Sequence, residues 1–322
     1  YFTMRGIKMK IVILDRATLG RDLDISVPIK ADIEAYDASP PQTVKERIAD
    51  ADVIFVNKVK LTEENLHGAK SLKLICEAAT GYDNIDVAYC AKNGIAVCNV
   101  PGYSVYSVAQ LTVGTVLYLA NRMKVYTGYV SSGEYTKSGE ANKLSPVFHE
   151  LCGLTWGIVG YGNIGKHVAS AAKAFGCRIL AFKKHPSDEA ECVDLDTLIK
   201  RSDIITVHLP LNRETRGIIT AERVNMIKNG AVFVNAARGA VADEEALCRA
   251  AGENRIYFGT DVYSEEPFGT ESPYYAIKNR DNVCFTPHMA WGAFEARKRC
   301  FNEMILNMCD FFGGGTRNRV DI

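Results

Sequence analysis

An apolar run that ends in Gly-x-Gly-x-x-Gly constrains this chain more than any other feature of its sequence. Residues 155–159 are typical of a buried strand; Gly160, Gly162 and Gly165 follow, and an Ala-rich helical stretch comes next. In this context the first glycine permits a tight turn, the second lets the backbone approach a pyrophosphate, and the third allows the helix to pack closely on the strand. The pattern therefore predicts a dinucleotide-binding turn.

The helix after this turn would place free backbone N–H groups and the positive end of its dipole beside a bound phosphate. Asn163 and Ile164 lie at that helix start and are expected to take part in cofactor binding. We expect a nicotinamide or flavin nucleotide. The alternative is a Rossmann-type domain that has lost its ligand.

Composition excludes several other classes of protein. The 322 residues suffice for two domains, and 38 basic residues balance 38 acidic ones. Nucleic-acid binding needs a concentrated basic face, which the sequence lacks, so no nucleic-acid partner is expected. The 10 cysteines are scattered without a C-x-x-C pair, which predicts reduced thiols in a cytoplasmic protein and no metal site. No signal peptide is visible in residues 1–8, and the apolar run 111–120 is too short to span a membrane.

Strand-like and helical runs alternate along the whole chain, as in proteins with parallel sheets. Strands are expected at residues 10–15, 32–36, 53–56, 72–78, 95–98, 156–159, 178–182, 204–208, 231–234, 257–261 and 283–285. Helices are expected at residues 42–49, 63–69, 87–93, 104–123, 164–174, 194–200, 221–227, 243–251 and 293–311.

This pattern predicts an α/β protein of two doubly wound parallel-sheet (Rossmann/flavodoxin-like) domains with a cleft between them. Residues 1–101 plus 291–322 would form the substrate (catalytic) domain, which the last helix completes. Residues 102–290 would form the nucleotide-binding Rossmann domain. Its Gly/Ser-rich polar segment 126–145 would be a protruding arm or loop.

Three segments after the glycine turn end an apolar strand with a polar side chain, namely Arg238, Glu266 and His288. Because the carboxyl ends of parallel strands share one edge of a sheet, these side chains can converge on the cofactor crevice. Arg238 offers a fork of donors for a carboxylate and a keto oxygen. His288 can donate a proton to that oxygen, and Glu266 can orient the imidazole ring. These three residue types suit hydride transfer to a 2-keto acid.

Some of these residues also have plain structural interpretations. An isolated arginine at a strand end is more often an ion-pair partner than a catalyst. His208 ends an apolar strand beside the expected adenine pocket, where a structural role fits as well as a functional one. Lys58 is better explained as a solvated lysine. Trp291 either lines the substrate pocket or anchors the last helix.

The motifs together resemble one enzyme family. They are Ala79–Asp86, Asn99–Ser104, Ser107–Gln110, the glycine turn, His208–Pro210, Asn235–Gly239, Asp261–Pro267 and Thr286–Trp291. Over nearly its whole length the chain resembles the D-isomer-specific 2-hydroxyacid dehydrogenases, in particular the glycerate dehydrogenase/hydroxypyruvate reductase branch. The resemblance implies an oxidoreductase that interconverts a short 2-keto acid, such as hydroxypyruvate or glyoxylate, and its D-2-hydroxy acid.

The resemblance also assigns roles to individual residues. Arg238, Glu266 and His288 would be catalytic, and Arg238 and His288 would also contact the substrate. The backbone N–H groups of Thr80, Gly81 and Tyr82 would bind the substrate carboxylate. Expected cofactor contacts besides the glycine turn and its helix start are His208, Pro210, Ala236, Arg238 and Asp261, the last at the nicotinamide amide. An arm at about 125–150 would build a homodimer.

Two positions depart from the family pattern. Gln110 stands where members often have Glu, which has little consequence. The second concerns the cofactor: NAD enzymes usually carry an acidic residue after the second strand, whereas this chain has Lys183 and Lys184. Positive charge there suits the 2′-phosphate of NADP(H), which we favour over NAD(H). Asp188 and Glu189 follow closely, however, and could fold back to the ribose.

Other functions remain open at this level. A nucleotide-sensing corepressor would share the architecture, although this chain has no basic or peptide-docking tail. A phosphite-type dehydrogenase would share the three catalytic side chains. A formate-type enzyme is disfavoured, because such enzymes carry Gln at the position of Glu266.

Overall fold

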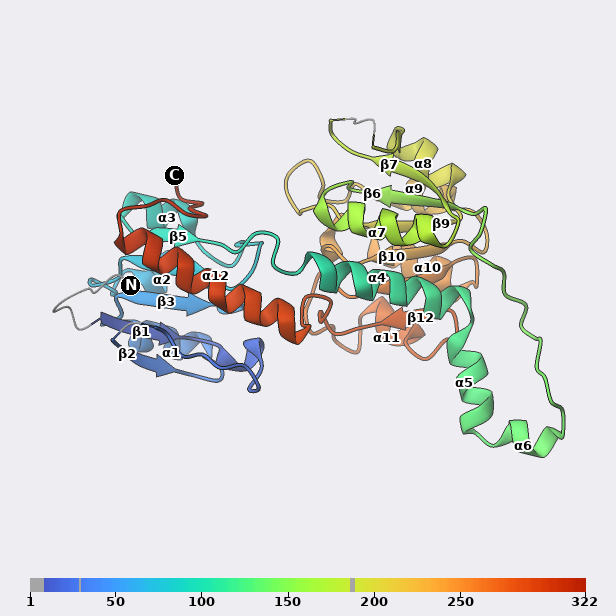
Figure 1. Cartoon of the computed structure of the whole chain (residues 1–322), viewed down its shortest axis with the longest axis horizontal. Coiled ribbons are helices and arrows are strands. Elements are labelled where there is room, and N and C mark those ends of the chain that lie inside the picture. The colour runs from blue at the N-terminus through green and yellow to red at the C-terminus, as the bar shows by residue number, and fades with distance from the viewer. Residues whose placement is uncertain (1–8, 29, 186–188) are drawn as a thin grey trace. The chain divides into compact units, whose positions relative to one another are not determined.

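The chain forms two compact units. The computed structural model describes residues 9–28, 30–185 and 189–322. One unit contains the chain up to Ser104 together with Gly292–Ile322, and the other contains Val105–Trp291. In Figure 1 the first unit is coloured blue and cyan with a red C-terminal helix, and the second runs from green to orange.

The first unit is built on a five-stranded parallel sheet in the order β2-β1-β3-β4-β5. Its strands are β1 (Met9–Ile13), β2 (Ala31–Ala35), β3 (Val53–Val56), β4 (Leu74–Glu77) and β5 (Ala96–Cys98). Every residue of β3, β4 and β5 is buried, as expected for strands that are covered on both faces. This strand order is the flavodoxin-like one.

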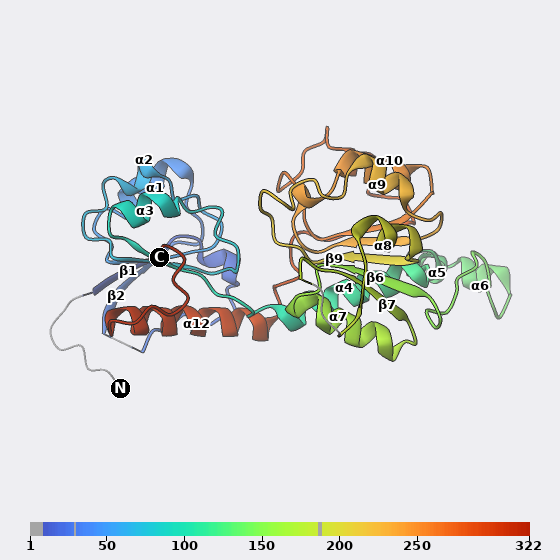
Figure 2. The ribbon, with the colours of Figure 1, turned by 90° about the horizontal axis from the view of Figure 1, so that it is seen from above.

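Helices cover both faces of this sheet. They are α1 (Pro41–Arg47), α2 (Glu63–Leu66), α3 (Val87–Lys92) and α12 (Phe294–Phe312). Figure 2 shows the first three on one face and α12 on the other. The α12 residues Ala296, Cys300, Met304 and Met308 are fully buried, and their spacing of four places them on one stripe that packs against the sheet.

The second unit contains a seven-stranded parallel sheet in the order β12-β11-β10-β9-β6-β7-β8. Its strands are β6 (Thr155–Val159), β7 (Arg178–Phe182), β8 (Glu191–Cys192), β9 (Ile204–Val207), β10 (Val232–Asn235), β11 (Tyr257–Thr260) and β12 (Val283–Phe285). Counted within the unit, this is the Rossmann order 3-2-1-4-5-6 with one strand added. The order reverses between β6 and β9, which is where such sheets bind ligands.

The helices of this unit lie on both sheet faces and in an extension. They are α4 (Val105–Ala120), α5 (Met123–Ser131), α6 (Glu134–Ser138), α7 (Asn163–Ala174), α8 (Leu195–Arg201), α9 (Ala221–Met226), α10 (Glu244–Gly252) and α11 (Pro273–Ile277). Helices α8–α10 cover one face, and α4 and α7 cover the other (Figure 2). Helices α5 and α6 extend away from the sheet (Figure 1).

The predicted α/β fold class, with two parallel sheets, is confirmed. The expected strands 53–56, 178–182 and 283–285 have the observed bounds. The long helix predicted to reach residue 123 ends at Ala120, because Arg122 adopts a left-handed backbone conformation (φ 55°). Within the described part of the chain, no helix has both the length and the apolar character needed to cross a membrane.

Candidate active site

The glycine turn lies at the point where the strand order of the second unit reverses. It joins β6 to α7, and β9 is the neighbour of β6 on the other side. Gly160 has φ 103°, and a Cβ at this position would lie 2.8 Å from the backbone carbonyl of His208, the residue after β9. Only glycine allows this close approach. The turn therefore depends on contact between two strand ends at the expected ligand crevice.

The start of α7 fits a dinucleotide phosphate. Gly162 caps the helix without a side-chain hydrogen bond, so the first-turn N–H groups, which include those of Asn163, Ile164 and Gly165, have no capping partner there. A Cβ at Gly162 would meet no atom within 4 Å, so space is open beside these donors. Unpaired donors, helix dipole and open space together suit the cofactor predicted from the sequence.

His208 is an unusual histidine. Both ring nitrogens are buried, and neither has a hydrogen-bond partner among the described residues. Burial lowers the pKa of His208 to about 3, so the ring is neutral and carries one donor and one acceptor. A buried imidazole without partners beside the glycine turn favours the functional interpretation of this residue.

The end of β7 carries the residues expected to recognise the adenosine ribose. Strand β7 ends at Phe182, so Lys183 is the first residue beyond it. Lys184 forms an exposed ion pair with Glu214 (Nζ–Oε2 2.7 Å), which partly offsets its positive charge. Glu189 pairs with Lys166 (2.7 Å) on α7. Asp188 lies outside the described residues.

Two other predicted cofactor contacts lie at strand ends of the same sheet. Pro210 follows β9, and its carbonyl accepts a hydrogen bond from the Thr215 hydroxyl (2.6 Å). Ala236 directly follows β10 and is partly exposed. Both therefore lie toward the edge that carries the glycine turn.

Strands β10, β11 and β12 are neighbours, and each precedes one residue of the predicted catalytic set. Glu266 and His288 are in direct contact, with Oε2 of Glu266 2.6 Å from Nδ1 of His288. Glu266 is fixed in turn, because its Oε1 accepts the Tyr263 N–H (3.1 Å). The other ring nitrogen of His288, Nε2, is thereby the one directed away from the carboxylate. This is the geometry of an oriented acid–base histidine.

Arg238 lies half-buried after β10, and among the described residues no hydrogen bond or ion pair joins its guanidinium to Glu266 or His288. Its Nη1 donates to the Ala237 carbonyl (2.8 Å), and Asn235 donates to the Arg238 carbonyl (2.9 Å). At the next residue, Gly239, a Cβ would lie only 2.2 Å from the backbone of Tyr263. This glycine lets the Arg238 segment pack directly on the segment that leads to Glu266.

Asp261 fixes the loop that carries His288. Its carboxylate accepts hydrogen bonds from the Thr286 hydroxyl (2.6 Å) and from the N–H groups of Met289 (2.9 Å) and Ala290 (2.8 Å). Burial raises the pKa of Asp261, and these three bonds act in the opposite direction. The expected contact with the nicotinamide amide remains a prediction, whereas the anchoring of the loop is a role that the sequence did not reveal.

Trp291 and Tyr263 complete this loop. The Trp291 indole N–H donates to the His288 carbonyl (3.0 Å), and the Tyr263 hydroxyl donates to the Thr286 carbonyl (2.9 Å). His288 itself has φ 49°, a left-handed conformation that is uncommon for a residue with a side chain. The surrounding hydrogen bonds hold this conformation, as is frequent for strained residues at functional sites.

The predicted substrate loop belongs to the first unit. It follows β4, and it is tied down where Thr80 donates to the Val100 carbonyl (2.9 Å) and Asn99 donates to the Thr80 carbonyl (2.8 Å). In the described part of the chain, the N–H groups of Gly81 and Tyr82 donate no hydrogen bond. The loop thus has the unpaired donors that an anion requires.

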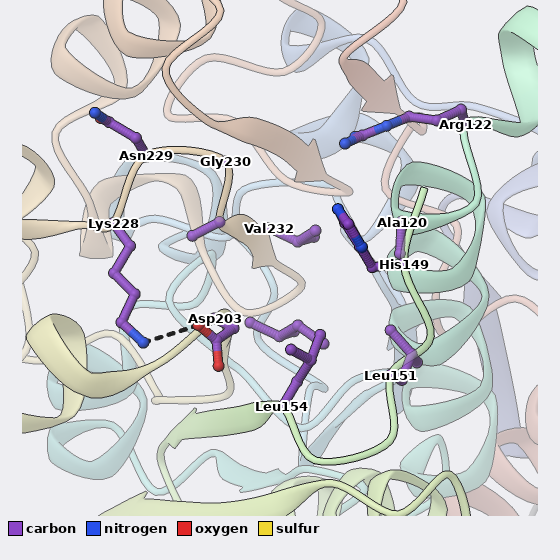
Figure 3. A pocket seen from close by; sticks show the side chains of 12 residues that line it. Ala120, Arg122, His149, Leu151, Leu154, Asp203, Lys228, Asn229, Gly230 and Val232 are labelled. Atoms are coloured by element: carbon purple, nitrogen blue, oxygen red, sulfur yellow. Dashed lines mark hydrogen bonds and ion pairs between the residues drawn. The ribbon is translucent and has the colours of Figure 1, made fainter. Parts of the chain in front are cut away.

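A cavity of about 190 Å³ lies at the opposite edge of the second sheet (Figure 3). Its lining includes Leu154, Ile204 and Val232 at the amino ends of β6, β9 and β10, and Lys228 paired with Asp203 (2.8 Å). The glycine turn follows the carboxyl end of β6, so this cavity is not the cofactor crevice. No cluster of metal-ligating side chains occurs among the described residues.

A Rossmann sheet with a glycine turn at its switch point, and an oriented histidine at the same edge, defines the class of nicotinamide-dependent oxidoreductases. The family model "D-isomer specific 2-hydroxyacid dehydrogenase, NAD binding domain" matches residues 113–290. The chain belongs to the D-isomer specific 2-hydroxyacid dehydrogenase family. It is an enzyme that interconverts keto acids and hydroxy acids with a nicotinamide cofactor.

Individual relatives agree with this assignment. The chain is 33% identical over 315 residues to the glycerate dehydrogenase of Methylorubrum extorquens, covering 97% of this chain and 99% of that protein. It is 39% identical over 263 residues to the hydroxypyruvate reductase of Thermotoga maritima, covering 80% of this chain and 84% of that protein. The solved D-lactate dehydrogenase of Aquifex aeolicus, a complex with NAD and lactic acid, superposes with a TM-score of 0.82 at 29% identity and covers 97% of this chain and 99% of that chain. These relatives do not favour the corepressor and phosphite-type alternatives.

Proposed function

We propose that this enzyme reduces a short 2-keto acid, with hydroxypyruvate or glyoxylate favoured, to the D-2-hydroxy acid, and catalyses the reverse reaction. The observation that carries the proposal is the 2.6 Å contact between His288 and Glu266 at the carboxyl edge of the nucleotide-binding sheet. Relatives named glycerate dehydrogenase, hydroxypyruvate reductase and glyoxylate reductase support this substrate class.

The chemistry divides among three side chains. The cofactor, when bound, would supply the hydride that the keto carbon accepts. Arg238 holds the substrate carboxylate and keto oxygen with its fork of donors, and the unpaired N–H groups of Gly81 and Tyr82 hold the carboxylate. His288 donates a proton from Nε2 to the keto oxygen, and Glu266 keeps the imidazole ring oriented.

The cofactor would be held by the start of α7 and by the strand ends beside it. The N–H groups of Asn163 and Ile164 would bind its phosphates. His208 offers two ring nitrogens that have no partner among the described residues, and Ala236 and Pro210 would contact the cofactor from the ends of β10 and β9. Asp261 would accept from the nicotinamide amide while it holds the His288 loop.

A substrate panel tests this function. Purified protein is assayed with glyoxylate, hydroxypyruvate, pyruvate and 2-ketoisocaproate, each with NADH and NADPH, by following loss of the reduced cofactor. We expect the highest kcat/KM with hydroxypyruvate or glyoxylate, and a D product. Arg238→Ala should raise the substrate KM and lower kcat together, because the carboxylate loses its bidentate partner. No turnover with any pair would contradict the proposal.

We also propose a preference for NADP(H). Lys183, which directly follows β7, and Lys184 beside it support this preference through their charge, although Glu214 offsets part of it. The native enzyme should show the higher kcat/KM with NADPH, and Lys183→Asp should reverse the order. Lys173→Asp is the matched control, because Lys173 lies near the C-terminal end of α7, away from the turn. A native preference for NADH that Lys183→Asp leaves unchanged would contradict this preference.

The arm at about 125–150 supports a homodimer. In this segment Val130, Leu144 and Val147 are 59%, 81% and 65% exposed, an unusual concentration of exposed apolar side chains. Burial against a second copy would remove them from water. Light scattering should give twice the 35.4 kDa chain mass, and Leu144→Lys combined with Val147→Lys should shift it toward the monomer. A monomeric native protein at micromolar concentration would contradict the homodimer.

The cysteines support a cytoplasmic location. All ten are free thiols in the structure, and six are buried. A reducing compartment preserves such thiols. Alkylation of freshly extracted protein, read by intact mass, should label exposed cysteines and reveal no disulfide.

A further inference from the structure

A buried carboxyl lies at the base of the predicted substrate loop. Glu77 is the last residue of β4, is 0% exposed, and is followed at once by the segment that leads to Thr80. Its Oε1 atom has no hydrogen-bond partner among the described residues. Burying such a group costs free energy unless it is neutral or paired, so its presence at this position requires an explanation.

The other oxygen of Glu77 holds the far end of the same loop. Glu77 Oε2 accepts a hydrogen bond from Nδ2 of Asn84 (2.9 Å). The Asn84 amide also donates to the Val59 carbonyl (3.2 Å), and its own backbone carbonyl accepts the Leu61 N–H (2.8 Å). The loop between residues 78 and 84 is therefore closed by a side-chain bond from its first residues to its last. Asn84 also links it to the segment after β3.

A neighbouring carboxyl shows that this arrangement is specific. Asp15 lies near the end of β1 and is also buried, but its carboxylate accepts the N–H groups of Asn57, Lys58 and Val59. Asp15 thus fixes the segment after β3 through the backbone. Among the described residues, Glu77 accepts one hydrogen bond, from the Asn84 side chain of the substrate loop, so its connection is to that loop.

We propose that Glu77 is a positioning residue for the substrate carboxylate, which acts through Asn84 to hold residues 80–83 in the conformation that presents the N–H groups of Gly81 and Tyr82. The inference rests on the proposed function, which assigns these N–H groups to the substrate. It adds two residues, Glu77 and Asn84, to which the family motifs give no role in positioning the substrate.

The charge of the site favours a neutral anchor. The substrate is an anion, and a full negative charge beneath its loop would oppose binding. Burial raises the pKa of Glu77 well above its ordinary value, which favours the uncharged form. An uncharged carboxyl still accepts the Asn84 bond. A glutamine at this position would therefore preserve both the bond and the charge.

The experiment compares Glu77→Gln, Glu77→Leu and Asn84→Leu with the native enzyme, using hydroxypyruvate and the preferred reduced cofactor. Both leucine variants should raise the hydroxypyruvate KM roughly tenfold, the scale of one lost buried hydrogen bond. The cofactor KM and kcat should stay near native, because the second unit is untouched. Glu77→Gln should keep the native hydroxypyruvate KM. The double leucine variant should be no worse than either single variant.

Controls separate positioning from general damage. Leu74→Val trims the core at the amino end of the same strand, and the hydroxypyruvate KM should not change. Asn84 is partly exposed, so Asn84→Leu keeps the test available if Glu77→Leu fails to fold. Native KM values in both leucine variants, or an equal rise in Leu74→Val, would overturn the inference while the proposed function stands. A native enzyme without turnover would overturn both.

Discussion

The two loops that carry the predicted substrate contacts are held in different ways. In the second unit, the loop with His288 is fixed by three hydrogen bonds to Asp261 and by a further bond from Trp291. In the first unit, the 80–83 loop is closed by the Glu77–Asn84 bond, and the N–H groups of Gly81 and Tyr82 have no acceptor within the described part of the chain. Proton transfer demands a preset geometry, whereas a carboxylate can complete the hydrogen bonding of the loop that receives it. Damage to the His288 loop should therefore lower kcat, and damage to the 80–83 loop should raise the substrate KM.

The largest effect is expected from His288→Asn. The variant removes the proton donor and should lower kcat by roughly 10²–10⁴-fold. Cofactor affinity, measured by fluorescence titration, should stay near native because the glycine turn is unchanged. His149→Asn, at the exposed end of the arm, is the control and should be fully active. Near-native turnover of His288→Asn would remove the basis for the contrast between the loops.

Asp261→Asn should have the next largest effect. The amide cannot accept all three donors of the His288 loop, and its NH₂ group would face a backbone N–H. We expect kcat to fall roughly 10- to 100-fold, the range for hydrogen bonds to a charged group. Glu244→Gln is a matched control, since Glu244 also accepts a backbone N–H group, that of Ser264 (2.8 Å). Equal losses in the two variants would show that Asp261 has no special role.

The smallest effect concerns stability. The folded-state pKa of Glu77 lies above the ordinary value of 4.5, so folding favours its protonated form. This contribution is fully present below about pH 4.5 and is lost as pH rises toward the folded-state pKa. Titratable groups facing Glu77 are Asp15, Lys58, Cys76, Asp83 and Cys300. Glu77→Gln does not titrate, so its Tm should match the native Tm near pH 4 and exceed it at neutral pH. If the difference between the two Tm values stayed the same from pH 4 to neutral pH, the pKa of Glu77 would not differ between the folded and unfolded states.

The sequence predicts the strands and the grouping of residues at their ends better than it predicts the tertiary contacts between side chains. Buried parallel strands are continuous apolar runs, so strands such as 178–182 could be placed to the residue. Arg238, Glu266 and His288 could be grouped because they follow strands whose carboxyl ends share an edge. By contrast, a glutamate that ends an apolar run is also typical of a strand that ends in solvent. The sequence therefore did not indicate that Glu77 is buried. The Lys184–Glu214 pair spans 30 residues and depends on tertiary packing.

Short elements were also missed for physical reasons. The two-residue strand β8 and the five-residue helix α11 are too brief to show a period. The polar 126–145 segment was expected to be an arm or loop, and its first part is helical in α5 and α6, which have no buried residues. Their exposure removes the apolar stripe by which a helix is recognised in a sequence.

The most direct test of the account is a double-mutant cycle on the 2.6 Å contact between Glu266 and His288. The central claim is that Glu266 works only through the imidazole of His288. The kcat for hydroxypyruvate reduction is measured in the native enzyme, Glu266→Gln, His288→Asn and the double variant. The account predicts that Glu266→Gln lowers kcat in the native background and has no further effect once His288 is replaced. Independent losses that multiply in the double variant would contradict it.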